Sequence, residues 1–175
     1  GAEFGSPLFV LNGVAVVHGL QGERRVPVRD FYLGPNRNAL ERGELLKAMA
    51  FPLPSKACKT SYRRSSRIRG MDLAGMNVAI YLDPLDGDPM KRELRIALGA
   101  LDKTPIRLDG VEEFLSRGQI GEEELRRVGD MIKAPLKPRA SSLRAGPEYK
   151  KSMAAHLSIS TLEEMLSSSE GEQRK

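Results

Sequence analysis

Two short runs of alternating apolar residues, joined by a turn-rich segment, constrain the fold of this chain most strongly. Aliphatic side chains occupy every second position of residues 78–82 and of residues 94–98. This period of two places them on one buried face of a β-sheet. The intervening Asp83-Pro84-Leu85-Asp86-Gly87-Asp88-Pro89 is rich in turn residues. Because this segment is too short for a parallel crossover, the sequence predicts an antiparallel pair of strands.

The sequence predicts shorter strands before this pair and helices after it. The expected strands are residues 8–17 with an interruption at Gly13, residues 23–28, and a strand that ends at Phe51-Pro52, with a loop at residues 31–37. The expected helices are residues 109–117 with Asp109 as N-cap, residues 121–133, and a long helix that Pro147 opens. Strands first and helices last predict an α+β fold with helices against an antiparallel sheet.

The chain divides into four predicted segments. Residues 1–6 read as a cloning scar, which implies that the natural chain was cut upstream. Pro52 and Pro54 restrict the residues before them and place a subdomain junction near residue 54. The expected domains are therefore residues 7–54 and 55–169, followed by a frayed polar tail at residues 170–175.

Composition excludes several kinds of site. A single cysteine, Cys58, rules out an internal disulfide and a cysteine-rich metal or iron–sulfur site. No apolar run approaches the length of a membrane helix, and no signal-peptide pattern is present. We therefore expect an intracellular, reducing environment. The formal net charge of +5 admits an anionic partner, but a modest excess of this size is more typical of a soluble surface.

Four arginines and one aspartate before the central strands form the one cluster that could bind a ligand: Arg63, Arg64, Arg67, Arg69 and Asp72. Arginine binds phosphate or stacks on a planar ring, and aspartate accepts an N–H bond from a heterocycle. The simpler interpretation is an exposed strand face with Asp72 capping a turn, and the residues alone favour it. A nucleic-acid interface is the weakest alternative, because only Tyr62 and Tyr81 lie near the basic residues for base stacking.

Four segments in order resemble the FAD-binding (medium) subunit of molybdenum hydroxylases, the carbon monoxide dehydrogenase and xanthine dehydrogenase family, in its C-terminal portion. They are Arg25–Pro35 with the following Ala39-Leu40 and Gly43-Glu44-Leu45-Leu46; Arg67–Ala74; Ala97–Leu101 with Thr104–Leu108; and Arg144 with Glu148-Tyr149-Lys150-Lys151. The resemblance runs from Pro7 to about Leu166. It implies an antiparallel sheet remnant of the second FAD-binding subdomain, followed by a C-terminal domain with a three-stranded antiparallel sheet and about three helices.

The resemblance also implies a function: a flavin subunit that relays electrons from iron–sulfur clusters through FAD to an acceptor. The implied partners are a molybdenum-cofactor large subunit and an iron–sulfur small subunit, in the cytoplasm, without nucleic acid or membrane insertion. No catalytic acid, base or nucleophile and no metal ligand is implied. The residues that the resemblance places near the flavin are Leu46 beside the isoalloxazine, Arg63 and Arg67 with Asp72 beside them, and Arg37 in the loop before Ala39-Leu40.

The family's two glycine-rich segments that hold the FAD diphosphate are absent from this chain. Backbone N–H donors of that kind offset the cost of desolvating a diphosphate. We therefore expect the isolated chain to bind FAD weakly or not at all and to be inactive alone. The alternative is a non-enzymatic module that docks partner subunits and holds no flavin.

Overall fold

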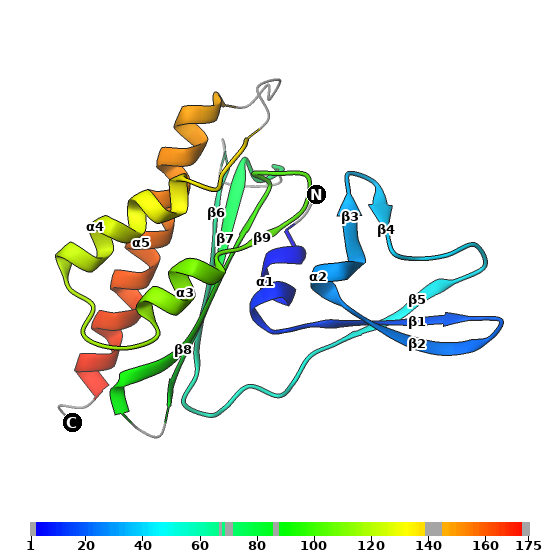
Figure 1. Cartoon of the computed structure of the whole chain (residues 1–175), viewed down its shortest axis with the longest axis horizontal. Helices are drawn as coiled ribbons and strands as arrows, with labels where there is room; N and C mark the ends of the chain where they lie inside the picture. Colours follow the sequence, from blue (N-terminus) through cyan, green and yellow to red (C-terminus); the bar gives the residue numbers. More distant parts are fainter. Residues whose placement is uncertain (1–2, 67, 69–71, 86–87, 139–144, 173–175) are drawn as a thin grey trace.

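The structure is a computed structural model that describes residues 3–66, 68, 72–85, 88–138 and 145–172. Figure 1 shows a larger unit, in which a sheet is covered by helices on one face, and a smaller strand-rich unit beside it. Two short helices, α1 (Gly5–Val10) and α2 (Val28–Phe31), lie where the two units meet.

The central antiparallel pair predicted from the alternating runs is confirmed. It is formed by β7 (Met76–Leu85) and β8 (Asp88–Gly99), with Val78 opposite Leu98 and Ile80 opposite Ile96. β6 (Lys59–Ser65) pairs with the other edge of β7, and the two-residue β9 (Ile106–Arg107) pairs with β8. The sheet order is β6-β7-β8-β9, so β9 adds a short fourth strand to the three that were expected.

Three helices cover one face of this sheet: α3 (Asp109–Leu115), α4 (Glu122–Lys133) and α5 (Pro147–Glu172). The aliphatic side chains of alternate strand positions meet their apolar stripes in one core, with Val78, Ile80, Ile96, Leu98, Val128 and Ile132 fully buried. Helix α3 begins at Asp109 with Leu108 as the N-cap residue, one position earlier than predicted.

The opposite face of the sheet is covered at its centre by α1. There Ala79 and Ala97 present small side chains, and Leu8, Phe9 and Val10 of α1 pack against them. Because both faces are covered, the first eight residues of β7 are all buried. A strand over residues 8–17 was expected; residues 8–10 instead form the end of α1, since a short apolar run fits a buried helix as well as a strand.

The smaller unit contains β1 (Val14–Gly19), β2 (Gly22–Pro27) and β5 (Leu45–Ala50), which form an antiparallel sheet in the order β2-β1-β5. The predicted loop at residues 31–37 contains instead a small hairpin of β3 (Tyr32–Gly34) and β4 (Arg37–Asn38), which follows directly from α2. Figure 1 shows this hairpin rising on the same side of α1 and α2 as the end of β6.

Residues 3–6, predicted to be a cloning scar, are part of the packing. Ser6 is fully buried in α1 and donates its hydroxyl to Asn77 Oδ1 at 2.5 Å, while Glu3 accepts the N–H of Ala74 at 3.1 Å. In the described part of the chain, no helix combines the length and hydropathy that crossing a lipid bilayer requires.

Candidate functional site

The predicted flavin-site residues fall on both units. Leu46 is on β5 and Arg37 is on β4, in the smaller unit, whereas Arg63 is on β6 and Asp72 lies between β6 and β7. Arg67 lies outside the described residues. The described members of the predicted set therefore lie in two separate places and do not form one cluster. The flavin contacts of these residues stay predictions.

Neighbouring arginines of β6 point to opposite faces of the sheet. Arg63 lies opposite Val78, on the face that the helices cover, and forms an ion pair with Glu164 of α5. Arg64 occupies the other face, where its Nη1 donates to the carbonyl oxygen of Asp72 at 3.1 Å and lies 3.3 Å from Oε1 of Glu3. Of the two, the described contacts place Arg64 beside Asp72.

The exposed face of β6 combines an aromatic ring and a guanidinium group. Tyr62 and Arg64 are two residues apart on the strand and therefore share a face. Tyr62 is 40% exposed, and partial burial raises the pKa of its phenol. A half-exposed ring beside an arginine is a surface that can bind a planar or anionic group.

In the smaller unit, a clamp of two charged side chains holds the loop that precedes β5. We call Arg24 of β2 and Glu44 the hairpin clamp. Arg24 Nε donates to Glu44 Oε1 and its Nη2 donates to Glu44 Oε2, both at 2.7 Å. The same Nη2 donates to the carbonyl oxygen of Ala39 at 2.7 Å, and Glu44 Oε2 accepts the N–H of Glu41 at 2.6 Å. The clamp thus contacts the loop at its beginning, its middle and its end.

The clamp keeps Glu44 ionised. The hydrogen bonds from Arg24, followed by the backbone N–H of Glu41, lower the pKa of Glu44 to about 2. The same carboxylate raises the pKa of the Arg24 guanidinium. The turns at residues 19–23 and 41–44 surround the clamp and leave beside it an open hollow of about 460 Å³, so solvent reaches the pair.

Just beyond the clamp, β5 exposes two leucines. Leu45 is 57% exposed and Leu46 is 39% exposed. The register of β5 against β1 shifts here, since Val17 pairs with Leu46 but Val16 pairs with Ala48, which leaves Lys47 as the extra residue of a bulge. Bulges re-aim neighbouring side chains and recur next to functional sites. Leu46 is thus an apolar side chain held at a surface by an irregular strand.

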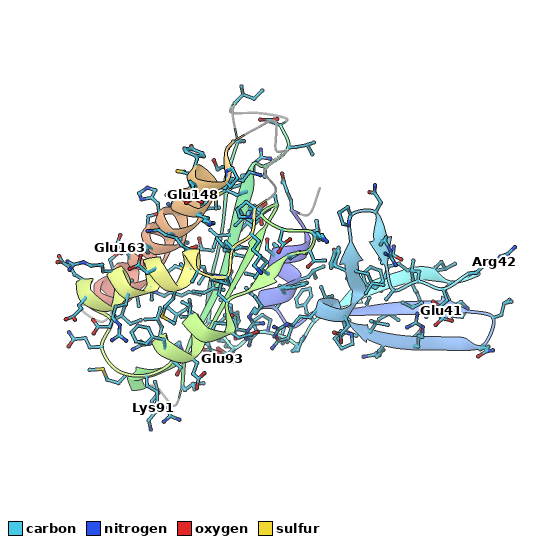
Figure 2. All side chains as sticks on the ribbon, turned by 45° about the horizontal axis from the view of Figure 1, so that its top comes forward. Glu41, Arg42, Lys91, Glu93, Glu148 and Glu163 are labelled. Carbon is cyan, nitrogen blue, oxygen red and sulfur yellow. The ribbon has the colours of Figure 1, made fainter. Side chains whose placement is uncertain are left out.

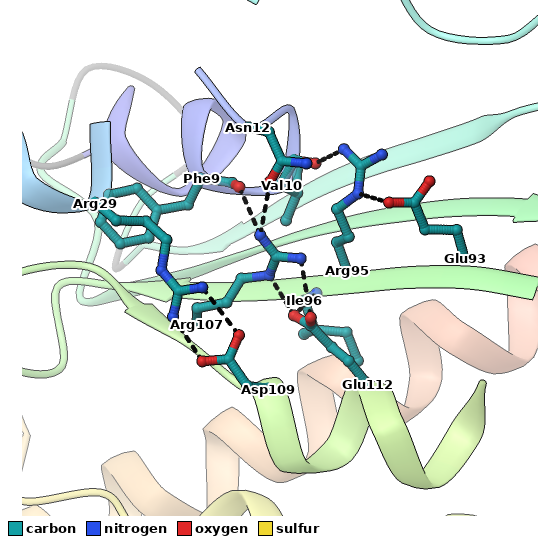
Figure 3. A network of polar contacts seen from close by, with 10 residues as sticks. All are labelled: Phe9, Val10, Asn12, Arg29, Glu93, Arg95, Ile96, Arg107, Asp109 and Glu112. Carbon is teal, nitrogen blue, oxygen red and sulfur yellow. Dashed lines mark hydrogen bonds and ion pairs between the residues drawn. The ribbon is translucent and has the colours of Figure 1, made fainter. Parts of the chain in front are cut away.

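A second network joins the two units and fixes the relation between them (Figure 3). Arg107 of β9 pairs with both oxygens of Glu112, donates to the carbonyl oxygen of Phe9 at 2.9 Å, and lies 3.2 Å from Asn12 Oδ1. Arg95 of β8 donates to the carbonyl oxygen of Val10 at 2.5 Å. These guanidinium groups therefore bind the carbonyl end of α1.

The described residues contain no group of three or more His, Cys, Asp or Glu side chains that could hold a metal ion. Their chemistry is that of a binding surface: exposed leucines on one unit, and a tyrosine with an arginine on the other. Neither Arg24 nor Glu44 was singled out from the sequence as a positioned charged side chain. The only signal was Glu44 within the resembling Gly43-Glu44-Leu45-Leu46 segment, because its partner is 20 residues away.

Comparison with known proteins gives a consistent set of similarities. Residues 60–165 match the family described as CO dehydrogenase flavoprotein C-terminal domain. The chain is 27% identical over 150 residues to a xanthine dehydrogenase FAD-binding subunit of Escherichia coli O157:H7, covering 85% of this chain and 50% of that protein. It is 28% identical over 142 residues to the carbon monoxide dehydrogenase medium chain of Hydrogenophaga pseudoflava, covering 81% and 48%.

A solved structure shows the same fold. The reconstituted CO dehydrogenase from Oligotropha carboxidovorans superimposes with a TM-score of 0.80 at 26% identity, over 89% of this chain and 53% of that one. The chain thus spans about half the length of the curated relatives that it matches.

Proposed function

The chain belongs to the CO dehydrogenase flavoprotein C-terminal domain family, and from this premise we propose that it forms the C-terminal half of the FAD-binding medium subunit of a molybdenum-hydroxylase-type dehydrogenase. The family match carries the proposal, because it extends from residue 60 in β6 to residue 165 in α5 and so includes nearly all of the four-stranded sheet, α3, α4 and most of α5. Relatives named as FAD-binding or medium subunits align over 150 and 142 residues of this chain, which is longer than the family match.

FAD, when bound, would accept electrons from iron–sulfur clusters and pass them to an acceptor. This chain's residues would bind and orient the flavin, since the described residues include no acid–base or nucleophilic set at the candidate site. Leu46 would supply apolar cover from β5, and Arg37 a positive charge from β4. On the other unit, Asp72, with Arg64 bound to its carbonyl group, would contribute polar contacts; Arg63 and Arg67 remain proposed contacts.

The residues of this chain fit one part of FAD and not another. Exposed leucines, a half-exposed tyrosine and arginines suit a planar ring system with polar edges. A diphosphate needs a glycine-rich loop or a helix N-terminus that aims backbone N–H groups at it, and the sequence contains no such loop of the usual spacing. We therefore propose that the phosphate-binding half of the site is provided by polypeptide outside these residues.

An absorbance measurement tests the proposal. The full-length gene product should co-purify with FAD and show the two visible bands of an oxidised flavin, whereas the 175-residue chain should not. A full-length product without flavin would contradict the proposed function. Stoichiometric flavin on this chain alone would contradict the proposed division of the site.

The complex would contain a molybdenum-cofactor large subunit and an iron–sulfur small subunit, in the cytoplasm. Co-purification with a tagged copy of this subunit, followed by metal analysis and cell fractionation, tests both points. The alternative of a docking module that holds no flavin is favoured by one observation: Leu20 on the smaller unit, and Phe51 and Leu53 on the segment that leaves it, are at least half exposed. A flavin-free full-length product that still captures both partner subunits would support this alternative.

A further inference from the structure

The hairpin clamp explains how a short exposed loop can hold an apolar surface in a fixed place, and this inference rests on the proposed function. We infer that Arg24 and Glu44 are positioning residues for the flavin, because together they hold residues 39–44 and thereby place Leu46 at the surface that we assign to the isoalloxazine ring. Neither residue needs to touch the cofactor. Their effect passes through the backbone to the start of β5.

The first step of the argument is how the loop is held. Outside the clamp, it has few other anchors: Ala39 N–H donates to the Phe31 carbonyl at 3.0 Å, and Leu40 N–H donates to Asn38 Oδ1 at 3.0 Å. Glu44 N–H closes a turn on the Glu41 carbonyl at 3.1 Å. Gly43 at φ +87° supplies the left-handed residue of this turn. The clamp ties this turn to β2, a strand of the sheet.

The second step is the geometry of the clamp. A planar guanidinium that donates in parallel to both oxygens of a carboxylate fixes their relative orientation as well as their distance. The side chain of Glu44 is only 14% exposed, although solvent reaches the pair. Two donors from Arg24 and one from the Glu41 backbone leave its carboxylate little freedom to turn.

The third step is the position of the leucines. Glu44 is directly bonded in sequence to Leu45, and the bulge at Lys47 follows at once. Leu45 pairs with His18 and Leu46 with Val17, so the two side chains lie on opposite faces of β5. Leu46 is held between the charged anchor on one side and the irregular pairing on the other. It stays 39% exposed, which costs the isolated chain hydrophobic stabilisation unless another group covers it. A planar ring system is such a group under the proposed function.

The test compares two variants, Glu44→Gln and Arg24→Lys, with a matched control. Glu123→Gln removes the same charge from an exposed position of α4 in the larger unit, outside the clamp, the loop and β5. In the 175-residue chain, amide exchange measured by mass spectrometry or NMR should quicken at Glu41 about fivefold or more in both variants and stay unchanged in the control.

The decisive arm uses the complete, flavin-loaded subunit. Glu44→Gln and Arg24→Lys should shift the visible circular dichroism of the bound flavin and its midpoint potential, while Glu44→Asp restores part of the shift and Glu123→Gln causes none. Urea unfolding midpoints measured in parallel separate a misplaced loop from a loss of fold.

Each other result counts against the inference. Faster exchange at Glu41 with unchanged flavin spectrum and potential would show a loop anchor without a positioning role. Unchanged exchange would show that the clamp does not hold the loop. A wild-type complete subunit that lacks flavin would instead overturn the proposed function, and the inference with it, before any variant is compared.

Discussion

At the scale of single residues, Gly99 is the position where the larger sheet tolerates no side chain. A Cβ at Gly99 would lie 2.4 Å from Oδ1 and 2.8 Å from Nδ2 of Asn77. Asn77 is fully buried, and its Oδ1 accepts the Ser6 hydroxyl. The amide therefore cannot move away without breaking the link between β7 and α1.

We predict that Gly99→Ala lowers the free energy of unfolding by about 1–3 kcal/mol, the usual cost of overpacking a rigid core. Urea denaturation followed by circular dichroism measures the change. Gly110→Ala is the control, because nothing lies within 4 Å of a Cβ there. Equal midpoints for Gly99→Ala and wild type would show that Asn77 yields more easily than its contacts indicate.

The protonation of Glu44 gives a second prediction at this scale. Its pKa falls from the ordinary 4.5 to about 2 on folding, so the clamp contributes its full stabilisation above pH 4.5 and loses it as the pH falls towards 2. The amide proton of Glu41, which donates to this carboxylate, should therefore show an NMR titration step near pH 2 that Glu44→Gln abolishes. A step near pH 4.5 would mean that the clamp is open in solution.

The sequence indicated the arginines of β6 but could not assign their faces. Arg63 and Arg64 are adjacent, so a strand must direct them to opposite sides. Which side is buried depends on the register against β7, where Arg63 lies opposite Val78. That register is set by tertiary contacts, which the sequence of β6 alone does not reveal. The same holds for Arg24, whose partner is brought to it only because β1 lies between β2 and β5.

At the scale of elements, the end of α1 is held by guanidinium groups from the larger sheet. Arg107 and Glu112 have side chains only 8% and 12% exposed, and Glu112 also accepts the N–H of Ile96 at 2.8 Å. Helix α1 has six residues, too few to be stable alone. Its position therefore depends on these contacts and on its apolar side chains.

We predict that Arg107→Met destabilises the chain by about 3 kcal/mol, because it leaves the buried Glu112 carboxylate without this counter-ion and removes the hydrogen bond to the Phe9 carbonyl group. Adding Glu112→Gln should recover part of the loss, since glutamine still accepts from Ile96 without carrying charge. Arg29→Met is the matched control: its bidentate pair with Asp109 is about half exposed and should cost under about 1 kcal/mol. Equal losses for the two arginines, measured by urea unfolding, would contradict this ranking.

Strong periodicity and proline signals made several elements predictable, namely the β7–β8 pair and the helices α3, α4 and α5. The failures were local. Residues 8–10 are apolar without a clear period, so tertiary packing against Ala79 and Ala97 decides that they are helical. The β3–β4 hairpin is too short for any periodicity to show, and Asn36 at φ +57° makes its turn possible.

At the scale of the whole molecule, the chain crosses between the units twice, once after α1 and once along residues 51–58. The second crossing is exposed along most of its length, and Ser55 ties it to Asp83 at 2.7 Å. Figure 2 shows the smaller unit extending away from the larger one, with Arg42 at its far end. The units are joined by α1, by Arg95 and Arg107, and by the Arg29–Asp109 pair.

We predict that cutting the second crossing leaves the molecule in one piece. A specific protease site inserted after Lys56, which is exposed, should be cleaved under native conditions. The two products should then co-elute with intact chain in size-exclusion chromatography, because α1 precedes the cut yet packs on the larger sheet. Separate peaks would show that the covalent connection along residues 51–58 holds the units together, and that the contacts of α1 and of the Arg29–Asp109 pair are too weak to do so.

The outer edge of β5 has a further consequence. In the described part of the chain, no strand pairs with that edge, and most of β5 is exposed. Such a row of main-chain donors and acceptors is a template on which identical chains can add to one another. Lys47, charged and out of register, breaks the row near its middle. The irregularity that presents Leu46 should thus also keep concentrated preparations from forming fibrils.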